Sequence, residues 1–121
     1  GLGDVYKRQY VGLRKNRSWC EKFGERYVYV VYNYFTPERV TAILDDMVKT
    51  MEPEMARHIK RWGIPSSMSA WKSSVSDLRG CLQKRTDYAL SSLQKEFGFS
   101  NAQMEQWKAN ATAQPVAAAA E

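Results

Sequence analysis

The stretch FTPERVTAILDDMVKTMEPEMARHIKRWG, residues 35–63, contains the clearest structural signals in the sequence. Thr36 supplies a hydroxyl for a helix N-cap, and Pro37 suits the first helical position, where its missing N–H costs nothing. The acid of Glu38 then faces the positive end of the helix dipole. The sequence therefore predicts a helix that begins at Pro37.

An apolar stripe runs along this predicted helix. Its members recur every three or four residues, the period of one helix face; they are Val40, Ile43, Leu44, Met47 and Met51. Pro53 lacks a backbone donor and clashes with the preceding turn, which predicts a kink or a restart at Glu52. Beyond it the apolar pattern continues to Gly63, a natural helix stop.

The preceding segment, residues 14–35, carries two conflicting signals. Its apolar residues recur at helical steps; they are Trp19, Phe23, Tyr27, Val30, Val31 and Tyr34. The run YVYVVY at 27–32 is β-branched and aromatic, a composition typical of a strand. The longer period favours a helix, with Asn16 or Ser18 as its N-cap.

Two more helices are predicted downstream. The serines of residues 66–69 offer N-caps for a helix that carries the apolar positions of residues 71–82. Thr86 and Asp87 offer a start for the next helix, and Gly98 offers its end.

A last short helix is predicted from Asn101 to Trp107, opened by Ser100 and Gln103 in capping-box spacing. No glycine-rich turn separates alternating apolar runs, which argues against a sheet. The predicted fold class is therefore all-α, with four or five short helices and short connections.

Composition narrows the classes of protein further. The 121 residues suit one domain, and 44% hydrophobic residues suffice for a packed core. The longest apolar run lies within residues 27–35, far short of the roughly 20 residues of a transmembrane helix, so no membrane span is expected. A net charge of +5 permits weak contact with nucleic acid, anionic lipid or acidic protein.

The chain has few residues of the kinds that bind metals or form disulfides. Cys20 and Cys81 are too few for a disulfide scaffold and lack C-x-x-C spacing, so both are predicted to be buried thiols. With His58 as its one histidine, the chain is not expected to hold a multi-histidine metal site or a histidine-centred relay.

The two ends differ from the middle. Residues 1–9, GLGDVYKRQ, show no periodic apolar pattern and resemble a translated sequencing-adaptor remnant, so we set them aside as non-native and expect an N-terminally truncated reading frame. Residues 10–108 form the expected helical subdomain. Residues 109–121 are alanine-rich and are expected to be a mobile tail or linker.

Residues 13–99 resemble the C-terminal helical part of the CotH-type spore-coat protein kinases. In that family an N-x-x-F helix start is followed by S/T-P-E-R-V and then by E-P-E-(apolar)-x-R-H-(apolar)-x-R-W. Asn16 with Trp19 stands in for the first motif, residues 36–40 match the second, and residues 52–62 match the third. The chain departs from the family pattern in two places: Trp19 replaces the usual phenylalanine, and Thr86 stands where proline is frequent.

The resemblance implies an atypical, compact protein-kinase-like fold that transfers phosphate from ATP to protein. It places the nucleotide- and metal-binding residues upstream, so ATP and Mg²⁺ are implied only for the full-length protein, with a spore-coat, cell-surface or secreted location. The chain itself has no Gly-rich loop and no H-R-D-like or D-F-G-like element. We therefore assign no catalytic, cofactor-binding or metal-binding residue and expect the fragment to be inactive alone.

The implied partners are the missing N-terminal catalytic lobe and a protein substrate. Arg57, His58 and Arg61 are candidates for docking to that lobe or for contacting phosphate, although exposed arginines are usually solvated. Asp45-Asp46 is expected to be a solvated pair, because adjacent helical residues point about 100° apart.

The four tryptophans are expected to be packing anchors. They are Trp19, Trp62, Trp71 and Trp107. The alternative function is a free-standing basic helical module that binds nucleic acid or an acidic protein partner through clusters such as residues 57–61 and Lys84-Arg85. No recognition helix for bases stands out, so nucleic acid is the less expected partner.

Overall fold

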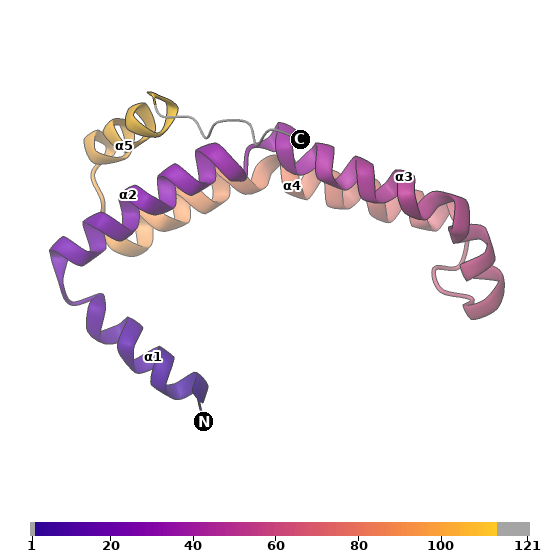
Figure 1. The fold of residues 1–121 in the computed structure, drawn as a ribbon, viewed down its shortest axis with the longest axis horizontal. Coiled ribbons are helices and arrows are strands. Elements are labelled where there is room, and N and C mark those ends of the chain that lie inside the picture. Colours follow the sequence, from indigo (N-terminus) through magenta and orange to yellow (C-terminus); the bar gives the residue numbers. More distant parts are fainter. Residues whose placement is uncertain (1, 114–121) are drawn as a thin grey trace. The chain divides into compact units, whose positions relative to one another are not determined.

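The computed structural model describes residues 2–113, with side chains from residue 7 onward; this part contains five helices and no strand (Figure 1). The helices are α1 (Leu2–Leu13), α2 (Arg17–Tyr34), α3 (Pro37–Trp62), α4 (Met68–Phe97) and α5 (Asn101–Ala113). The predicted all-α class is confirmed. None of these helices combines the length and the hydropathy needed to cross a bilayer.

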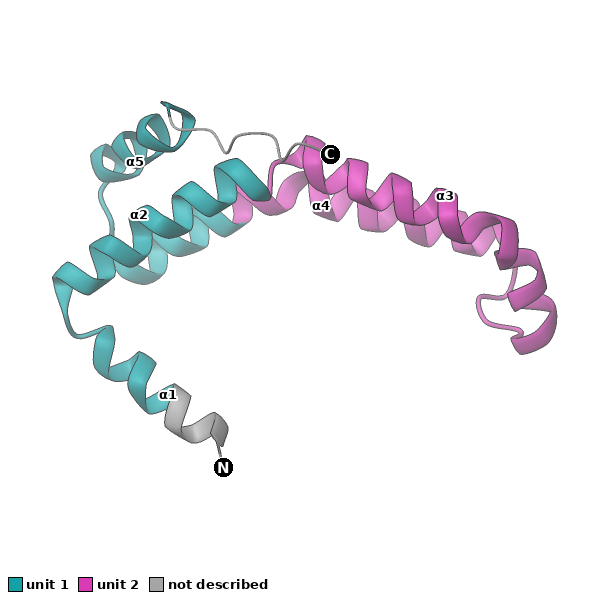
Figure 2. Cartoon of the chain, viewed as in Figure 1, with its two compact units in different colours: residues 1–34, 89–121 teal, residues 35–88 magenta. Residues whose placement is uncertain are grey.

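The chain groups into two compact units (Figure 2). Unit 1 comprises residues 1–34 and 89–121, and unit 2 comprises residues 35–88. Helix α4 contributes residues to both units. Each unit has its own packing and is described separately.

The core of unit 1 is aromatic. Its buried members are Cys20, Val28, Leu93, Phe99 and Trp107, with partly buried rings of α2 and α4 around them. Phe97 stacks on Phe99 with 5.5 Å between the ring centroids, and Phe99 meets the edge of Trp107 at 4.8 Å. The strand-like run at 27–32 is helical because its apolar period matches this core.

Close approach of α2 and α5 depends on Gly24. A Cβ atom at this position would lie 2.7 Å from Phe99 Cε2 and 2.8 Å from Trp107 Cζ3. At the far end of the helix pair, the Asn33 side-chain amide donates a hydrogen bond to the Ala111 carbonyl at 3.1 Å. The rings of α5 and its flanking loop thus occupy the space that a side chain at residue 24 would take.

The capping signals of unit 1 are confirmed in detail. The Asn16 carboxamide oxygen, rather than the Ser18 hydroxyl, accepts a hydrogen bond from the Trp19 amide at 3.2 Å. At α5, the backbone N–H of Gln103 donates a hydrogen bond to Ser100 Oγ at 3.2 Å, and the backbone N–H of Ser100 donates one to Gln103 Oε1 at 3.1 Å. Both ends of the predicted capping box are therefore made.

Unit 2 is a helical hairpin of α3 and the first part of α4. The Arg39 amide donates to Thr36 Oγ1 at 3.2 Å, which confirms the predicted N-cap, and Gly63 ends α3 with φ of 68°. Of the kink or restart predicted at Glu52, the restart is wrong, because α3 continues through Pro53 to Trp62, while the kink stays a prediction. One lost backbone donor does not outweigh the hydrogen bonds and packing of a 26-residue helix.

The helix start predicted at Thr86 and Asp87 is also wrong. Helix α4 runs for 30 residues without interruption. Instead of capping a helix, the Thr86 hydroxyl donates a hydrogen bond to the Phe35 carbonyl at 2.7 Å. This bond satisfies the Phe35 carbonyl, which lies just beyond the end of α2. Thr86 therefore has a hydroxyl group for this contact, although in the sequence the same hydroxyl resembles that of a helix N-cap.

Two predictions of burial need correction. Cys20 is buried, but Cys81 is exposed on α4. Among the tryptophans, Trp107 is buried and Trp19 and Trp71 are partly buried, whereas Trp62 is 63% exposed. Trp62 therefore anchors no packing among the described residues.

The expected boundaries of the helical subdomain, residues 10 and 108, both lie within helices. Residues 2–9, set aside as non-native, belong to α1, and their origin stays a prediction. At the other end α5 passes the expected boundary at residue 108 and continues to Ala113, with Ala111 buried. The rest of the predicted tail, 114–121, lies outside the described residues.

Ion pairs join the two helices of unit 2. Asp45 of α3 pairs with Arg79 of α4, and Glu52 pairs with Lys72 at 2.8 Å. The hydrogen bond from the Arg79 guanidinium holds the pKa of the Asp45 carboxyl below its ordinary value and raises the pKa of Arg79. Both pairs are largely solvent-exposed, so each contributes modestly to stability.

Gly24→Ala is expected to destabilise unit 1 by about 1–3 kcal/mol, because the added methyl group displaces the rings of Phe99 and Trp107. Thermal and urea unfolding would measure the change. Gly80→Ala is the matched control: a Cβ there meets nothing within 4 Å, so the same substitution should stabilise its helix by roughly 0.5–1 kcal/mol. Equal effects of the two substitutions would contradict this account of the packing.

Asp45→Asn is expected to lower the melting temperature slightly near neutral pH and to have no effect in strong acid. The folded-state pKa of Asp45 is depressed, so its stabilisation is present above the ordinary carboxyl pKa and is lost as pH falls through the folded value. Thermal unfolding followed against pH would measure this. Asp46→Asn is the control, since Asp46 forms no salt bridge within the part of the chain that the structure describes; a loss of equal size would refute the role of the Asp45–Arg79 pair.

Candidate interaction surfaces

The described residues offer no assembled catalytic centre. No group of three or more His, Cys, Asp and Glu side chains gathers in residues 7–113. Asp45 is engaged with Arg79, while Asp46 lies on the exposed side of α3. Both acids are exposed, as predicted, although Asp45 is not merely solvated but pairs with Arg79.

The largest difference between the predicted and the observed burial of side chains is on α3. Of its predicted apolar stripe, Leu44 is buried and Val40 is partly buried, but Ile43, Met47 and Met51 are 47%, 57% and 51% exposed. These three residues follow one another at steps of four on a single helix face. We refer to Ile43, Met47 and Met51 as the α3 stripe.

The α3 stripe lies on one side of the residues that α4 covers. With 100° per residue, the buried positions Leu44 and Met55 form a line along α3. The ion-paired acids Asp45 and Glu52 fall on one side of this line, and Met47 falls on the other. One flank of the contact with α4 is therefore polar and closed by ion pairs, whereas the other is apolar and open.

The predicted candidates Arg57, His58 and Arg61 all lie exposed on the last turns of α3. Arg57 pairs with Glu54 at 3.0 Å, and the Arg61 guanidinium lies 5.0 Å from the centroid of the Trp62 ring. All three side chains therefore lie on one exposed stretch of α3. Their contact with a lobe or with phosphate stays a prediction.

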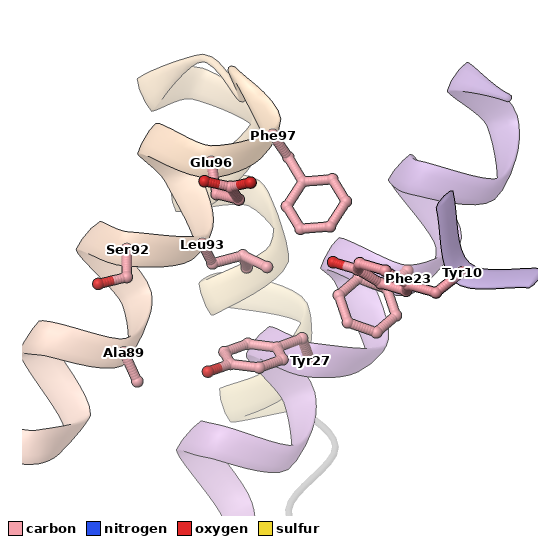
Figure 3. A pocket seen from close by; sticks show the side chains of 8 residues that line it. All are labelled: Tyr10, Phe23, Tyr27, Ala89, Ser92, Leu93, Glu96 and Phe97. Atoms are coloured by element: carbon pink, nitrogen blue, oxygen red, sulfur yellow. The ribbon is translucent and has the colours of Figure 1, made fainter. Parts of the chain in front are cut away.

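Unit 1 contains a pocket of about 290 Å³ that was not predicted from the sequence (Figure 3). Its walls come from α1, α2 and α4; they are Tyr10, Phe23, Tyr27, Ala89, Ser92, Leu93, Glu96 and Phe97. The aromatic spacing of α2 was a signal for it, but the sequence does not show which rings leave a hollow between them.

The charge inside this pocket is largely balanced. Arg14 pairs with the Glu96 carboxylate at 2.7 Å and lies 5.0 Å from the centroid of the Phe97 ring. Ser92 lines the same pocket, but the single histidine of the chain belongs to α3, so the pocket has no histidine base to activate the hydroxyl. The lining of the pocket is thus mainly apolar and aromatic.

Comparison with known protein families finds a match for this chain. The family described as CotH kinase protein matches residues 12–89, well over half of the chain. The match contains α2, α3 and most of α4, and thus the whole of unit 2. No curated protein and no solved structure matches the sequence significantly. The chain belongs to the CotH kinase protein family.

Proposed function

We propose that this chain is the helical part of a CotH-type protein kinase domain and that it supplies packing surface rather than catalytic residues. The complete domain would transfer a phosphoryl group from ATP to a protein of the spore coat or of the secreted fraction. ATP and Mg²⁺ would be held by residues outside this chain, because the described residues offer neither a phosphate cradle nor a cluster of carboxylates.

The observation that carries the proposal is the α3 stripe. Three large apolar side chains on one face, each about half exposed, are characteristic of a surface that another part of a protein covers. The stripe lies within the residues that match the family, so the rest of a CotH kinase domain is a consistent occupant. This family match supports the proposal over a free-standing basic module.

Recovery of the coding DNA upstream of residue 10 from the source sample is the direct test. We expect a continuous reading frame that encodes a nucleotide-binding lobe with a lysine and metal-binding carboxylates. An in-frame start codon immediately before Tyr10 would overturn the proposal.

The isolated chain is expected to show no shift in melting temperature and no phosphate transfer with Mg²⁺-ATP, since it lacks the residues that would bind the nucleotide. Differential scanning fluorimetry and radiolabelled ATP would measure the two quantities. A nucleotide-dependent stabilisation would show that the assignment of roles is wrong.

Replacing Ile43, Met47 and Met51 together by serine is expected to reduce self-association of the isolated chain and its binding of a hydrophobic dye. The unfolding free energy should change little, by roughly 0.5 kcal/mol per site or less, because each side chain is exposed. Analytical ultracentrifugation and unfolding curves would measure both.

Leu44→Ala is the control, because Leu44 is a buried residue of the same helix. We expect it to lower the free energy of unfolding by about 2–5 kcal/mol. If the triple variant were destabilised as strongly, the stripe would be part of the core of this chain. It would then be no surface for the rest of the domain.

A further inference from the structure

We propose that the turn between α3 and α4 docks onto an anionic lipid surface. We call residues 57–72 the hairpin tip; it includes the last turns of α3, the connection and the first turn of α4, at one end of unit 2 (Figure 1). The inference rests on the charge, the exposure and the shape of this segment. It does not depend on the proposed kinase role.

The hairpin tip is a cationic segment without acids. Residues 55–76 contain no Asp or Glu but contain four permanent cations: Arg57, Lys60, Arg61 and Lys72. Arg57 and Lys72 pair with Glu54 and Glu52, acids that lie before the tip on α3. Lys60 and Arg61 form no salt bridge with any described residue, so their charge is available to an external anion.

Two large apolar side chains protrude among these cations. Trp62 is 63% exposed and Ile64 is 75% exposed, the highest value among the large hydrophobic residues described. The Arg61 guanidinium stacks beside the Trp62 ring, with 5.0 Å from its Cζ atom to the ring centroid. An exposed indole, an exposed aliphatic chain and adjacent cations therefore lie within five consecutive residues, 60–64.

A lipid–water interface matches each of these groups. Indole rings locate at the headgroup level, aliphatic side chains enter the acyl region, and Lys and Arg interact with headgroup phosphates. A cation near an anionic membrane contributes about 1 kcal/mol. The phosphate predicted as a contact of Arg61 is thus assigned to a lipid headgroup.

The shape of the segment favours a membrane over an acidic peptide. Trp62 and Ile64 flank Gly63, where the chain leaves the helix with a left-handed backbone and reverses toward α4. A protruding turn presents its side chains to a flat surface. An extended or helical peptide is instead bound in a groove or at a sheet edge.

The test is binding of the full chain to phosphatidylcholine vesicles that contain about one-third phosphatidylglycerol, measured by cosedimentation at low and physiological salt. Pure phosphatidylcholine vesicles are the reference. We expect strong binding to the anionic vesicles only, reduced by salt. Brominated lipids should quench tryptophan fluorescence in wild type, and Trp62→Phe should keep the binding while losing most of the quenching.

Two pairs of variants isolate the hairpin tip. Trp62→Ser with Ile64→Ser removes the apolar part, and Lys60→Glu with Arg61→Glu reverses the free charges; each should weaken binding by about tenfold or more. The controls are Phe35→Ser with Leu78→Ser, and Lys84→Glu with Arg85→Glu, which make the same kinds of change at exposed positions of unit 2 outside both the hairpin tip and the α3 stripe. Circular dichroism checks that every variant is folded.

Several outcomes would overturn the proposal. These are no binding to anionic vesicles, equal loss in the control variants, or quenching that persists in Trp62→Phe. Preferential binding of an acidic peptide or of nucleic acid would assign the tip to another partner, and full competition by free glycerol phosphate would assign it to a soluble phosphate. None of these results bears on ATP binding or on the α3 stripe, so the two proposals fail separately.

Discussion

Unit 1 depends on the absence of a side chain at residue 24. Because Gly24 has no Cβ, the rings of Phe99 and Trp107 approach the α2 backbone and complete the aromatic core. Gly98, with φ of 66°, lets the chain leave α4 in the left-handed conformation that delivers Phe99 to this place. One glycine therefore makes the space, and the other directs the ring that fills it.

Unit 2 is built in a different way. Among its large side chains only Leu44 and Met55 are buried, and exposed ion pairs close one flank of the hairpin. Exposed ion pairs add little free energy, so two long helices are held by a narrow line of apolar contact. Such a hairpin has more apolar surface than its own partner helix covers, which explains why both proposed interaction surfaces belong to this unit.

Local signals made the helices predictable. Thr36, Asn16 and Ser100 cap helices in the structure because capping depends on a side chain and the backbone two or three residues away. Signals that conflict with long-range contacts failed: Pro53 does not end α3, and Thr86 bonds a carbonyl of a segment 51 residues away. Sequence spacing carries no information about that distant partner.

The sequence indicates which residues share a helix face, but not which of them another helix covers. The period of α3 identifies its apolar positions but not which of them α4 covers. Leu44 is covered, whereas Met47 is left exposed. The same limit applies to Trp62, whose spacing fits a core position although no described element packs over it. The exposed position of Arg57, His58 and Arg61 on α3 follows from the helix predicted there, whereas their docking role stays a prediction.

The exposed thioethers of Met47 and Met51 make the stripe chemically variable. Oxidation would convert each to a sulfoxide, which is polar and chiral, whereas the buried sulfur of Met55 is shielded from oxidant. The α3 stripe would then present polar sulfoxides in place of flexible, polarizable thioethers, while the fold of α3 would stay unchanged. Oxidation of Met47 and Met51 would therefore weaken any association through this face, and enzymatic reduction of the sulfoxides would restore it.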